Sequence, residues 1–263
     1  EEFDSLYVYV VAHEDDWQLF MGEVAHKNLL KPNSKSLFIY LTAGEAGREK
    51  VFWNAREVGA MASIAQVYGD TVGNNYNELE KLSANKNIAY RFFGNTSSYF
   101  LRIPDGNGLG NGFERHGYQS LKKLYNGDID KVIDVENNNT YTLAEIKEVI
   151  RDLVSFEAQD VRGMAFYFSE DDVFVNPNSH PDHVASSTIA QEALASFEGP
   201  KYGFEDYVIA QKPVNLTEEE IGMKRAMWDH YDFHMVNLAG YHTVQREGTI
   251  YYSWLERSYY RLL

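Results

Sequence analysis

Residues 7–22 read YVYVVAHEDDWQLFMG, and this stretch decides how the rest of the chain is interpreted. Its first six residues are rich in valine and tyrosine, which is typical of a buried strand. A polar run from His13 to Asp16 follows, and a helical pattern begins at Trp17. In an open α/β sheet, ligands bind at the carboxyl ends of strands. This turn is therefore predicted to hold the active site.

The polar turn has the composition of half a metal site. His13 and Asp16 lie three residues apart across a strand-to-helix turn, so both side chains can converge on one ion. Asp15 must then point another way, which leaves a carboxylate beside that ion. Two adjacent ionised carboxylates repel each other unless a cation or hydrogen bonds compensate them. The same residues also suit a plain helix N-cap, where aspartate is common, and this segment alone leaves both interpretations open.

A second polar turn at 179–183 reads SHPDH and precedes the helical run VASSTIAQEALASF. Pro181 suits the first helical position, where its missing N–H is not needed. His183 then lies in the first helical turn, close to the preceding loop. Catalytic zinc usually has three protein ligands and a fourth position for water. His13, Asp16 and His183 would supply such a set from two segments.

Five sequence elements follow one another in the order found in one known family. They are HEDD at 13–16 followed by Gly22, LTAGEAGR at 41–48, AREVGAMASIAQVYG at 55–69, RIPDG at 102–106 and HPDH at 180–183. With these elements the chain resembles the LmbE-like or PIG-L superfamily of zinc-dependent N-acetylglucosamine de-N-acetylases, over about residues 5–235. The resemblance implies an α/β, Rossmann-like fold with a mostly parallel sheet and helices on both faces.

The resemblance also implies roles for residues in both turns. Three residues match the family's ligands for one Zn²⁺ per chain: His13, Asp16 and His183. Asp15 matches the general base that takes a proton from the attacking water. His180 matches the histidine that stabilises the tetrahedral intermediate, and Asp182 is the expected partner of that imidazole.

Two positions depart from the family, which usually has proline in place of Glu14 and glutamate in place of Trp17. Neither position is a ligand, so the metal site is expected to be kept while the shape and charge of the mouth differ. Trp17 could stack against a sugar ring at the mouth, or it could occupy a core or helix-cap position. Asp105 resembles the family's substrate-contacting aspartate, although Pro-Asp-Gly also suits a plain turn.

Two charged residues are further candidates for substrate binding. Glu45 follows the predicted strand at 36–41, so in a parallel sheet it could lie at the rim of the site or be a solvated loop acid. Arg56 could face a sugar hydroxyl or an acidic substituent of the substrate. Alternatively, Arg56 could pair on the helix surface with Glu57 or Glu49.

Composition limits the possible functions. The 263 residues suffice for one large α/β domain with a sizeable core. A net charge of −15 argues against binding to nucleic acid or an anionic membrane surface, and favours a neutral or cationic substrate. The chain has no cysteine, which excludes thiol catalysis and disulfides and leaves histidines and carboxylates as metal ligands.

Strands and helices alternate along the chain, as in a parallel α/β sheet. Strands are predicted at 6–12, 36–41, 88–93, 164–169 and 207–211, and helices at 17–30, 51–68, 142–156, 183–197 and 217–231. We expect a single LmbE-like catalytic domain over 1–263, with an irregular insertion at 94–141 as a lid or cleft wall. The aromatic tail, which includes Trp254, is expected to pack against this domain.

The predicted function is zinc-dependent removal of an N-acetyl group from an N-acetylglucosamine-type sugar or glycoconjugate. The alternatives are a zinc hydrolase acting on a different amide or acyl substrate and a non-catalytic carbohydrate-binding relative. No apolar run is long enough for a membrane span. The first residue is Glu1, so a cytoplasmic location and export with a removed signal both stay open. The sequence does not indicate an oligomeric state.

Overall fold

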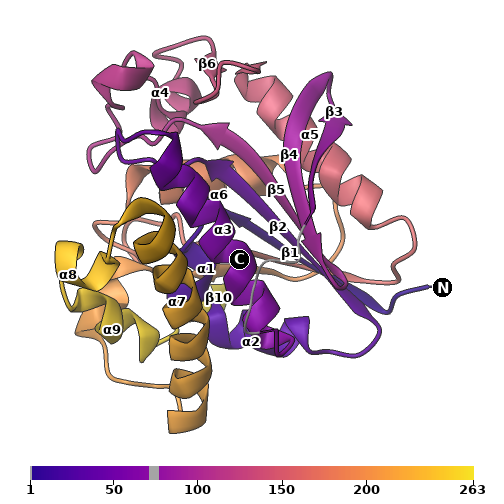
Figure 1. The fold of residues 1–263 in the computed structure, drawn as a ribbon. Helices are drawn as coiled ribbons and strands as arrows, with labels where there is room; N and C mark the ends of the chain where they lie inside the picture. Colours follow the sequence, from indigo (N-terminus) through magenta and orange to yellow (C-terminus); the bar gives the residue numbers. More distant parts are fainter. Residues whose placement is uncertain (1, 71–76) are drawn as a thin grey trace.

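The computed structural model describes residues 2–70 and 77–263. The strands in this part of the chain are β1 (Ser5–Val11), β2 (Ser34–Thr42), β3 (Asn77–Ser83), β4 (Lys86–Phe93), β5 (Thr96–Ile103), β6 (Val132–Ile133), β7 (Thr140–Tyr141), β8 (Met164–Ser169), β9 (Lys201–Phe204) and β10 (Tyr260–Leu262). One sheet has the order β10-β9-β8-β1-β2-β5-β4-β3, and β6 pairs with β7 separately. From β9 to β5 the neighbours are parallel, whereas β10, β4 and β3 pair antiparallel at the edges. The expected mostly parallel α/β fold is confirmed (Figure 1).

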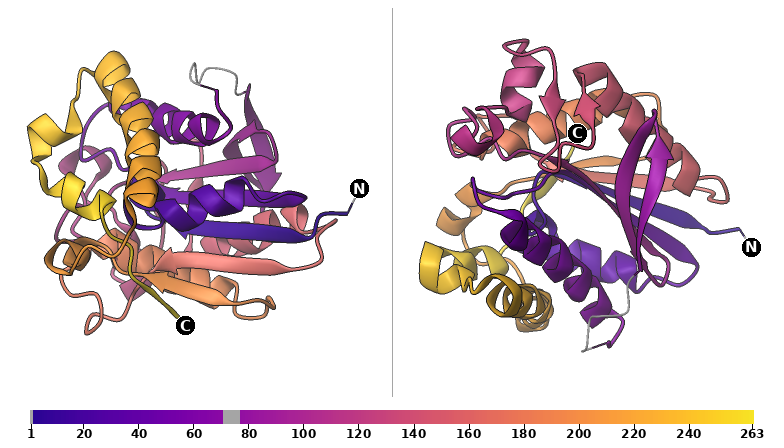
Figure 2. Two further views of the ribbon diagram at one scale, coloured as in Figure 1. Left: turned by 90° about the horizontal axis from the view of Figure 1, so that it is seen from below. Right: turned by 45° about the horizontal axis from the view of Figure 1, so that its top comes forward.

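Helices cover both faces of this sheet (Figure 2). They are α1 (Asp16–Phe20), α2 (Gly22–Leu29), α3 (Lys50–Val67), α4 (Leu121–Asn126), α5 (Leu143–Glu157), α6 (Pro181–Ala193), α7 (Glu218–Ala239), α8 (Thr243–Glu247) and α9 (Ile250–Leu255), with 3₁₀ helices η1 (Glu114–His116) and η2 (Tyr207–Gln211). Side chains of β1 alternate between two cores, because successive residues of a strand point to opposite faces. Tyr7 and Tyr9 join the core with α3 and α7, and Leu6 and Val8 join the core with α5 and α6. Within 2–70 and 77–263, no helix is both long and apolar enough to cross a bilayer.

The topology places two turns side by side at the centre of the sheet. β1 lies between β2 and β8, so the chain leaves β1 toward one side and later returns on the other. Such a switch point opens a crevice at the carboxyl ends of the strands. The turn that begins at His13 follows β1, and the segment that leads to His180 and α6 follows β8. Residues about 170 positions apart in sequence therefore meet.

The helix predicted at 17–30 is broken at Met21 into α1 and α2. Two remote side chains bind carbonyl groups at the break. Lys224 Nζ donates to the Leu19 carbonyl (2.8 Å), and Ser258 Oγ donates to the Phe20 carbonyl (3.2 Å). Because these partners lie 205 and 238 residues away, the local helical pattern contains no sign of the break.

Two predictions about strands were wrong. Part of the segment 94–141, predicted to be irregular, forms β5, which pairs with β2 on one side and β4 on the other. Residues 207–211, predicted to be a strand, form η2, and the strand beside β8 is β9. The chain turns at Asp206, whose Oδ1 accepts the backbone N–H of Tyr207 (2.5 Å). This turn ends the extended conformation before the Val-Ile pair that favoured a strand.

Candidate metal centre and catalytic cavity

Three donor atoms from the two turns converge at the switch point. His13 Nδ1 lies 3.5 Å from Asp16 Oδ1 and 3.2 Å from His183 Nε2, and the last two atoms are 3.0 Å apart. Ligands bound tetrahedrally at about 2.0–2.1 Å from zinc are about 3.3–3.4 Å from one another. The three side chains are buried. Their spacing therefore fits a tetrahedrally coordinated ion.

Hydrogen bonds hold the donor atoms in this orientation. Asp16 Oδ2 accepts the backbone N–H groups of Ala12 (3.0 Å) and His13 (2.8 Å), which leaves Oδ1 directed at the other donors. His183 Nδ1 lies 2.9 Å from Asp206 Oδ2, and this contact directs Nε2 toward the site. A carboxylate behind a ligating imidazole is a common support in metal sites. Sequence reasoning missed Asp206 because it placed the neighbouring strand after this residue rather than before it.

The electrostatics of the three groups favour positive charge between them. Burial opposes the charged form of His183, but Asp16 and Asp206 outweigh burial and raise the pKa of His183 to about 10. Burial likewise opposes ionisation of Asp16, but the positive charges of His183 and His13 hold the pKa of Asp16 well below its usual range. These three groups thus bind a proton tightly at the place where a metal cation would be stabilised.

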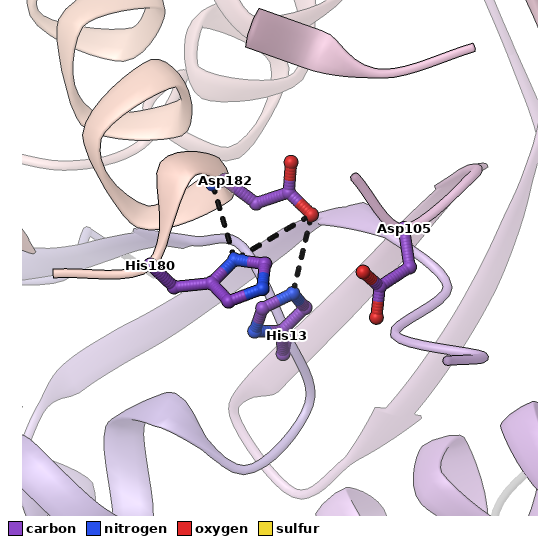
Figure 3. Close-up of side chains that lie close together, drawn as sticks. All are labelled: His13, Asp105, His180 and Asp182. Carbon is purple, nitrogen blue, oxygen red and sulfur yellow. Dashed lines mark hydrogen bonds and ion pairs between the residues drawn. The ribbon is translucent and has the colours of Figure 1, made fainter. Parts of the chain in front are cut away.

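A second group surrounds the other side of the His13 ring (Figure 3). Asp182 Oδ2 lies 3.4 Å from His13 Nε2 and 3.8 Å from His180 Nδ1, and it accepts the Gly106 N–H (2.7 Å). Asp105 approaches the same side chains, with one possible ligand atom of each residue within 4.8 Å of the others. Asp182, the predicted partner of His180, therefore contacts both imidazoles, and His13 Nε2 is the nearer nitrogen.

The protonation of His180 follows from its contacts. The backbone N–H of Asp182 donates to His180 Nδ1 (3.2 Å), so the hydrogen of the neutral ring lies on Nε2. Burial, and next the charge of nearby His13, lower the pKa of His180 to about 4. At neutral pH His180 is therefore an uncharged hydrogen-bond donor, and its side chain lines the cavity beside the candidate metal centre.

Asp15 and its sequence neighbour Glu14 both bind Arg56. The guanidinium donates through Nη2 to Asp15 Oδ1 and through Nε to Glu14 Oε2 (3.0 Å). The predicted alternative, pairing of Arg56 with Glu57 or Glu49, is wrong. Burial raises the pKa of Asp15 despite the guanidinium. Within 2–70 and 77–263, no side chain forms a hydrogen bond to Asp15 Oδ2, so this atom can accept a proton.

A cavity of about 210 Å³ adjoins the candidate metal centre, and as the candidate active site it is called the catalytic cavity below. The candidate site residues that line it are His13, Asp15, Asp16, Arg56, Asp105 and His180. Trp17 is absent from this lining because it is fully buried, with its indole N–H donating to the Tyr40 hydroxyl (3.0 Å) and its ring packed on Phe38. The predicted stacking platform at the mouth is thus wrong, and the alternative core position is confirmed.

Glu45 lies neither at the rim nor in solvent. Its side chain is fully buried, and Oε2 accepts the backbone N–H of Asp105 (2.9 Å). The Asp105 carboxylate in turn accepts the N–H groups of Asn107 (2.7 Å) and Ala46 (3.3 Å). Both predictions for Glu45 were therefore wrong, because the residue supports Asp105 from inside the protein.

A larger cavity of about 530 Å³ lies beside Arg48, Arg115 and Glu136. Its charged side chains pair with one another, as in the contacts of Arg115 with Glu49 and of Lys50 with Glu136. Neither possible metal-binding group of the described residues lines this cavity. The smaller cavity therefore holds the chemically competent groups.

Comparison with known families agrees with this geometry. The family model described as PIG-L, GlcNAc-PI de-N-acetylase, matches residues 8–194. The chain belongs to the PIG-L family. The PIG-L match includes every residue of the two histidine–aspartate groups, whereas Asp206 and the rest of the C-terminal segment lie beyond it. Membership of PIG-L supports a hydrolase of the de-N-acetylase type, and the buried groups can bind a metal ion. No curated protein matches the chain.

Proposed function

We propose that this PIG-L protein is a zinc-dependent hydrolase that removes the N-acetyl group from an N-acetylglucosamine-type sugar or glycoconjugate. The observation that carries the proposal is the tetrahedral spacing of three donor atoms beside two further acid–base groups. His13, Asp16 and His183 would hold one zinc ion, which accepts imidazole and carboxylate ligands. Asp15 and His180 line the same cavity and would act on the substrate.

The hydrogen bonds favour binding of the metal by His13, Asp16 and His183 over binding by the second group, which contains His180 and Asp182. In the second group, His180 Nδ1 accepts the N–H of Asp182, and Asp182 Oδ2 accepts the N–H of Gly106. These lone pairs are already used by the backbone. In the first group, Asp16 Oδ1 and His183 Nε2 face each other without a backbone donor between them. We therefore assign the metal to the first group and positioning of the imidazoles to Asp182.

The chain's own residues would supply base catalysis. A bound zinc ion would polarise the acetamide carbonyl and lower the pKa of water from about 15.7 toward about 7. Asp15 Oδ2 would take the proton of the attacking water, while Arg56 holds Oδ1 and orients the carboxylate. Burial, which raises the pKa of Asp15, makes this carboxylate a stronger base than an exposed one.

His180 would stabilise the transition state. As the water oxygen bonds to the carbonyl carbon, negative charge develops on the carbonyl oxygen, and the Nε2–H of His180 would donate to it. Such a donor lowers the barrier by about 2.7–4 kcal/mol. The C–N bond then breaks, and the amine nitrogen takes up the proton that Asp15 received. The second proton of the water stays on the new carboxyl group and then passes to the amine, so the products are acetate and the ammonium form of the amino sugar.

Two further residues are proposed substrate contacts. Arg56 lines the cavity from α3, and Asp105 lines it from the turn after β5. We also propose that residues 1–263 form one catalytic domain, in which the segment that follows β5 contributes the cleft wall around Asp105.

The test is acetate release from a panel of N-acetylglucosamine compounds, measured with and without a chelator on protein of assayed metal content. We expect release that the chelator abolishes and added zinc restores. Stoichiometric zinc without acetate from any compound would contradict the deacetylase and leave a different amide substrate or a binding role. Protein that binds no zinc when zinc is supplied would contradict the metal site itself.

A further inference from the structure

Four residues beyond the PIG-L match line the catalytic cavity. They are Tyr207, Glu247, Tyr251 and Trp254, which we call the C-terminal wall. They come from η2, the end of α8, and α9. The Tyr207 ring lies 5.4 Å from the ring of His183, so the wall directly adjoins the candidate metal centre. A substrate held at that centre would contact this wall.

The aromatic members of the wall form a connected platform. Tyr207 stacks on Trp254 with ring centres 5.1 Å apart, and the indole N–H of Trp254 donates to the Tyr207 carbonyl (3.3 Å). Tyr251 meets Trp254 edge to face at 4.8 Å. These contacts limit rotation of the rings. The cavity thus has a preformed apolar surface of the kind that suits the C–H face of a sugar ring.

Glu247 brings negative charge to this surface. Its carboxylate accepts the hydroxyl groups of Tyr241 (2.6 Å) and Tyr251 (2.5 Å), which hold it in one orientation. The residue is exposed, and its charge interacts with both Asp15 and Arg56. A carboxylate held in this way can accept hydrogen bonds from sugar hydroxyls, whereas it repels a phosphate or carboxylate.

Positive charge in the cavity is already neutralised. Among the described residues that line it, Arg56 is the one lysine or arginine, and Glu14 and Asp15 bind its guanidinium. An anionic group next to the acetamide would therefore meet Glu247 without a free basic side chain. The cavity of about 210 Å³ is smaller than the roughly 300–1,000 Å³ of pockets for drug-sized ligands, which suits a single sugar ring.

We propose that the C-terminal wall binds the sugar ring that carries the acetamido group, and that Glu247 selects uncharged sugars over sugars with an anionic substituent. This inference rests on the proposed function for the position of the acetamide. It assigns specificity to a part of the chain outside the family match, while the matched part contributes the reaction chemistry.

The test compares two substrates that share the acetamido group, the methyl glycoside of N-acetylglucosamine and N-acetylglucosamine 1-phosphate. Acetate release by the zinc-loaded protein gives kcat/KM for each. We expect the uncharged glycoside to be preferred by roughly tenfold or more, and Glu247→Gln to reduce this preference by about tenfold. Glu256→Gln is the matched control, because Glu256 lies at the end of α9 and pairs with Arg225 away from the cavity. It should keep the wild-type preference.

The outcomes separate this inference from the proposed function. Equal use or preference of the phosphate by the wild type would overturn the inference, as would an unchanged preference in Glu247→Gln. If neither compound is hydrolysed, both become stable ligands for calorimetry, and the proposed function fails only when the whole panel also releases no acetate. If the wild type binds the glycoside more tightly than the phosphate, and Glu247→Gln abolishes this difference, the result would still support the role of the C-terminal wall. Equal affinities, or no binding of either compound, would overturn it.

Discussion

The PIG-L part of the chain and the C-terminal segment after it contribute different groups to one cavity. Residues 8–194 contribute histidines and carboxylates, and residues 195–263 contribute aromatic rings and an exposed carboxylate. The first set lies at the carboxyl ends of β1 and β8, where parallel topology brings two turns together. The second set depends on the packing of η2, α8 and α9. On the proposed assignments, the PIG-L part supplies the groups for reaction chemistry, and the C-terminal wall adds to the substrate contacts of Arg56 and Asp105.

One buried side chain joins the two parts. Lys224 Nζ donates to the carbonyl of Leu19 in α1 and to the carbonyls of Trp254 and Arg257 at the end of α9. An ammonium with three backbone acceptors satisfies its full donor capacity. Lys224 therefore links α1 directly to the end of α9, which carries part of the C-terminal wall.

The largest effect is expected from removing a ligand in the PIG-L part. His183→Ala should abolish stoichiometric zinc binding and reduce acetate release by at least about 10³-fold, because no other group supplies the metal's Lewis acidity. Metal analysis and acetate assays on the same samples check this. His230→Ala is the control and should keep both, because the His230 side chain bonds the Ala226 carbonyl of its own helix α7. Zinc retained at wild-type stoichiometry in His183→Ala would contradict the assignment.

A smaller effect is expected when the proposed oxyanion donor is removed. His180→Ala should reduce kcat by about 10²–10³-fold and leave zinc content unchanged, because His180 is assigned to the substrate side of the cavity. Steady-state kinetics with metal analysis test this separation. Loss of zinc together with activity would instead make His180 a ligand, and would move the metal toward the second histidine–aspartate group.

Lys224→Met tests the joint between the two parts. Three carbonyls, of which those of Leu19 and Trp254 are buried, would lose this donor, so we expect the free energy of unfolding to fall by about 2–4 kcal/mol. KM should rise more than kcat falls, because the wall shifts while the metal centre remains. Urea unfolding and kinetics measure both effects. Lys27→Met is the control, since Lys27 also bridges to α7 but is exposed, and it should cost less than about 1 kcal/mol.

Glu45→Gln should show how much a buried acid in the PIG-L part lowers the free energy of unfolding at neutral pH. Burial, and next the charge of Asp105, raise the pKa of Glu45 from 4.5 to about 7. The folded state therefore holds this proton more tightly than the unfolded state, and the stability of the wild type falls as the pH rises from about 4.5 to about 7. Linkage limits this loss to about 3 kcal/mol. Glutamine does not titrate, so the variant should not lose stability over this pH range, and its side-chain oxygen can still accept the backbone N–H of Asp105.

Urea unfolding at pH 5 and pH 8 checks this sign. The stability gain of Glu45→Gln over the wild type should be small at pH 5 and larger at pH 8. Glu114→Gln, at an exposed position of η1, should show no such increase. Equal gains at both pH values would show that Glu45 does not hold the proton.

Local patterns predicted which polar residues converge, because the members of each turn are close in sequence. The strand at 164–169 was predicted with its observed bounds, and the helices predicted from 142 and 217 begin there, with Thr142 and Thr217 as their N-caps. The ligand pair within HEDD and the HPDH turn each depend on a single strand-to-helix connection. Parallel topology then brings the two turns together, so the predicted set of three converges.

The rest of the site depends on contacts that no local pattern contains. Asp206 reaches His183 from the turn after β9, and the aromatic wall is positioned by helix packing near the end of the chain. The sequence offered one signal, an aromatic tail that was expected to pack, and Trp254 does lie against Tyr207. Its position at the catalytic cavity could not be inferred, because the break between α1 and α2 and the bonds of Lys224 both involve remote residues.

The most direct test of the account compares two neighbouring carboxylates that share one partner. Asp15 and Glu14 both bind Arg56, but only Asp15 lines the cavity. Acetate release and zinc content should be measured together for Asp15→Asn and Glu14→Gln. We predict that Asp15→Asn keeps zinc and loses activity by about 10²–10⁴-fold, whereas Glu14→Gln loses far less. Near-normal turnover by Asp15→Asn would contradict the assignment of Asp15 as the base.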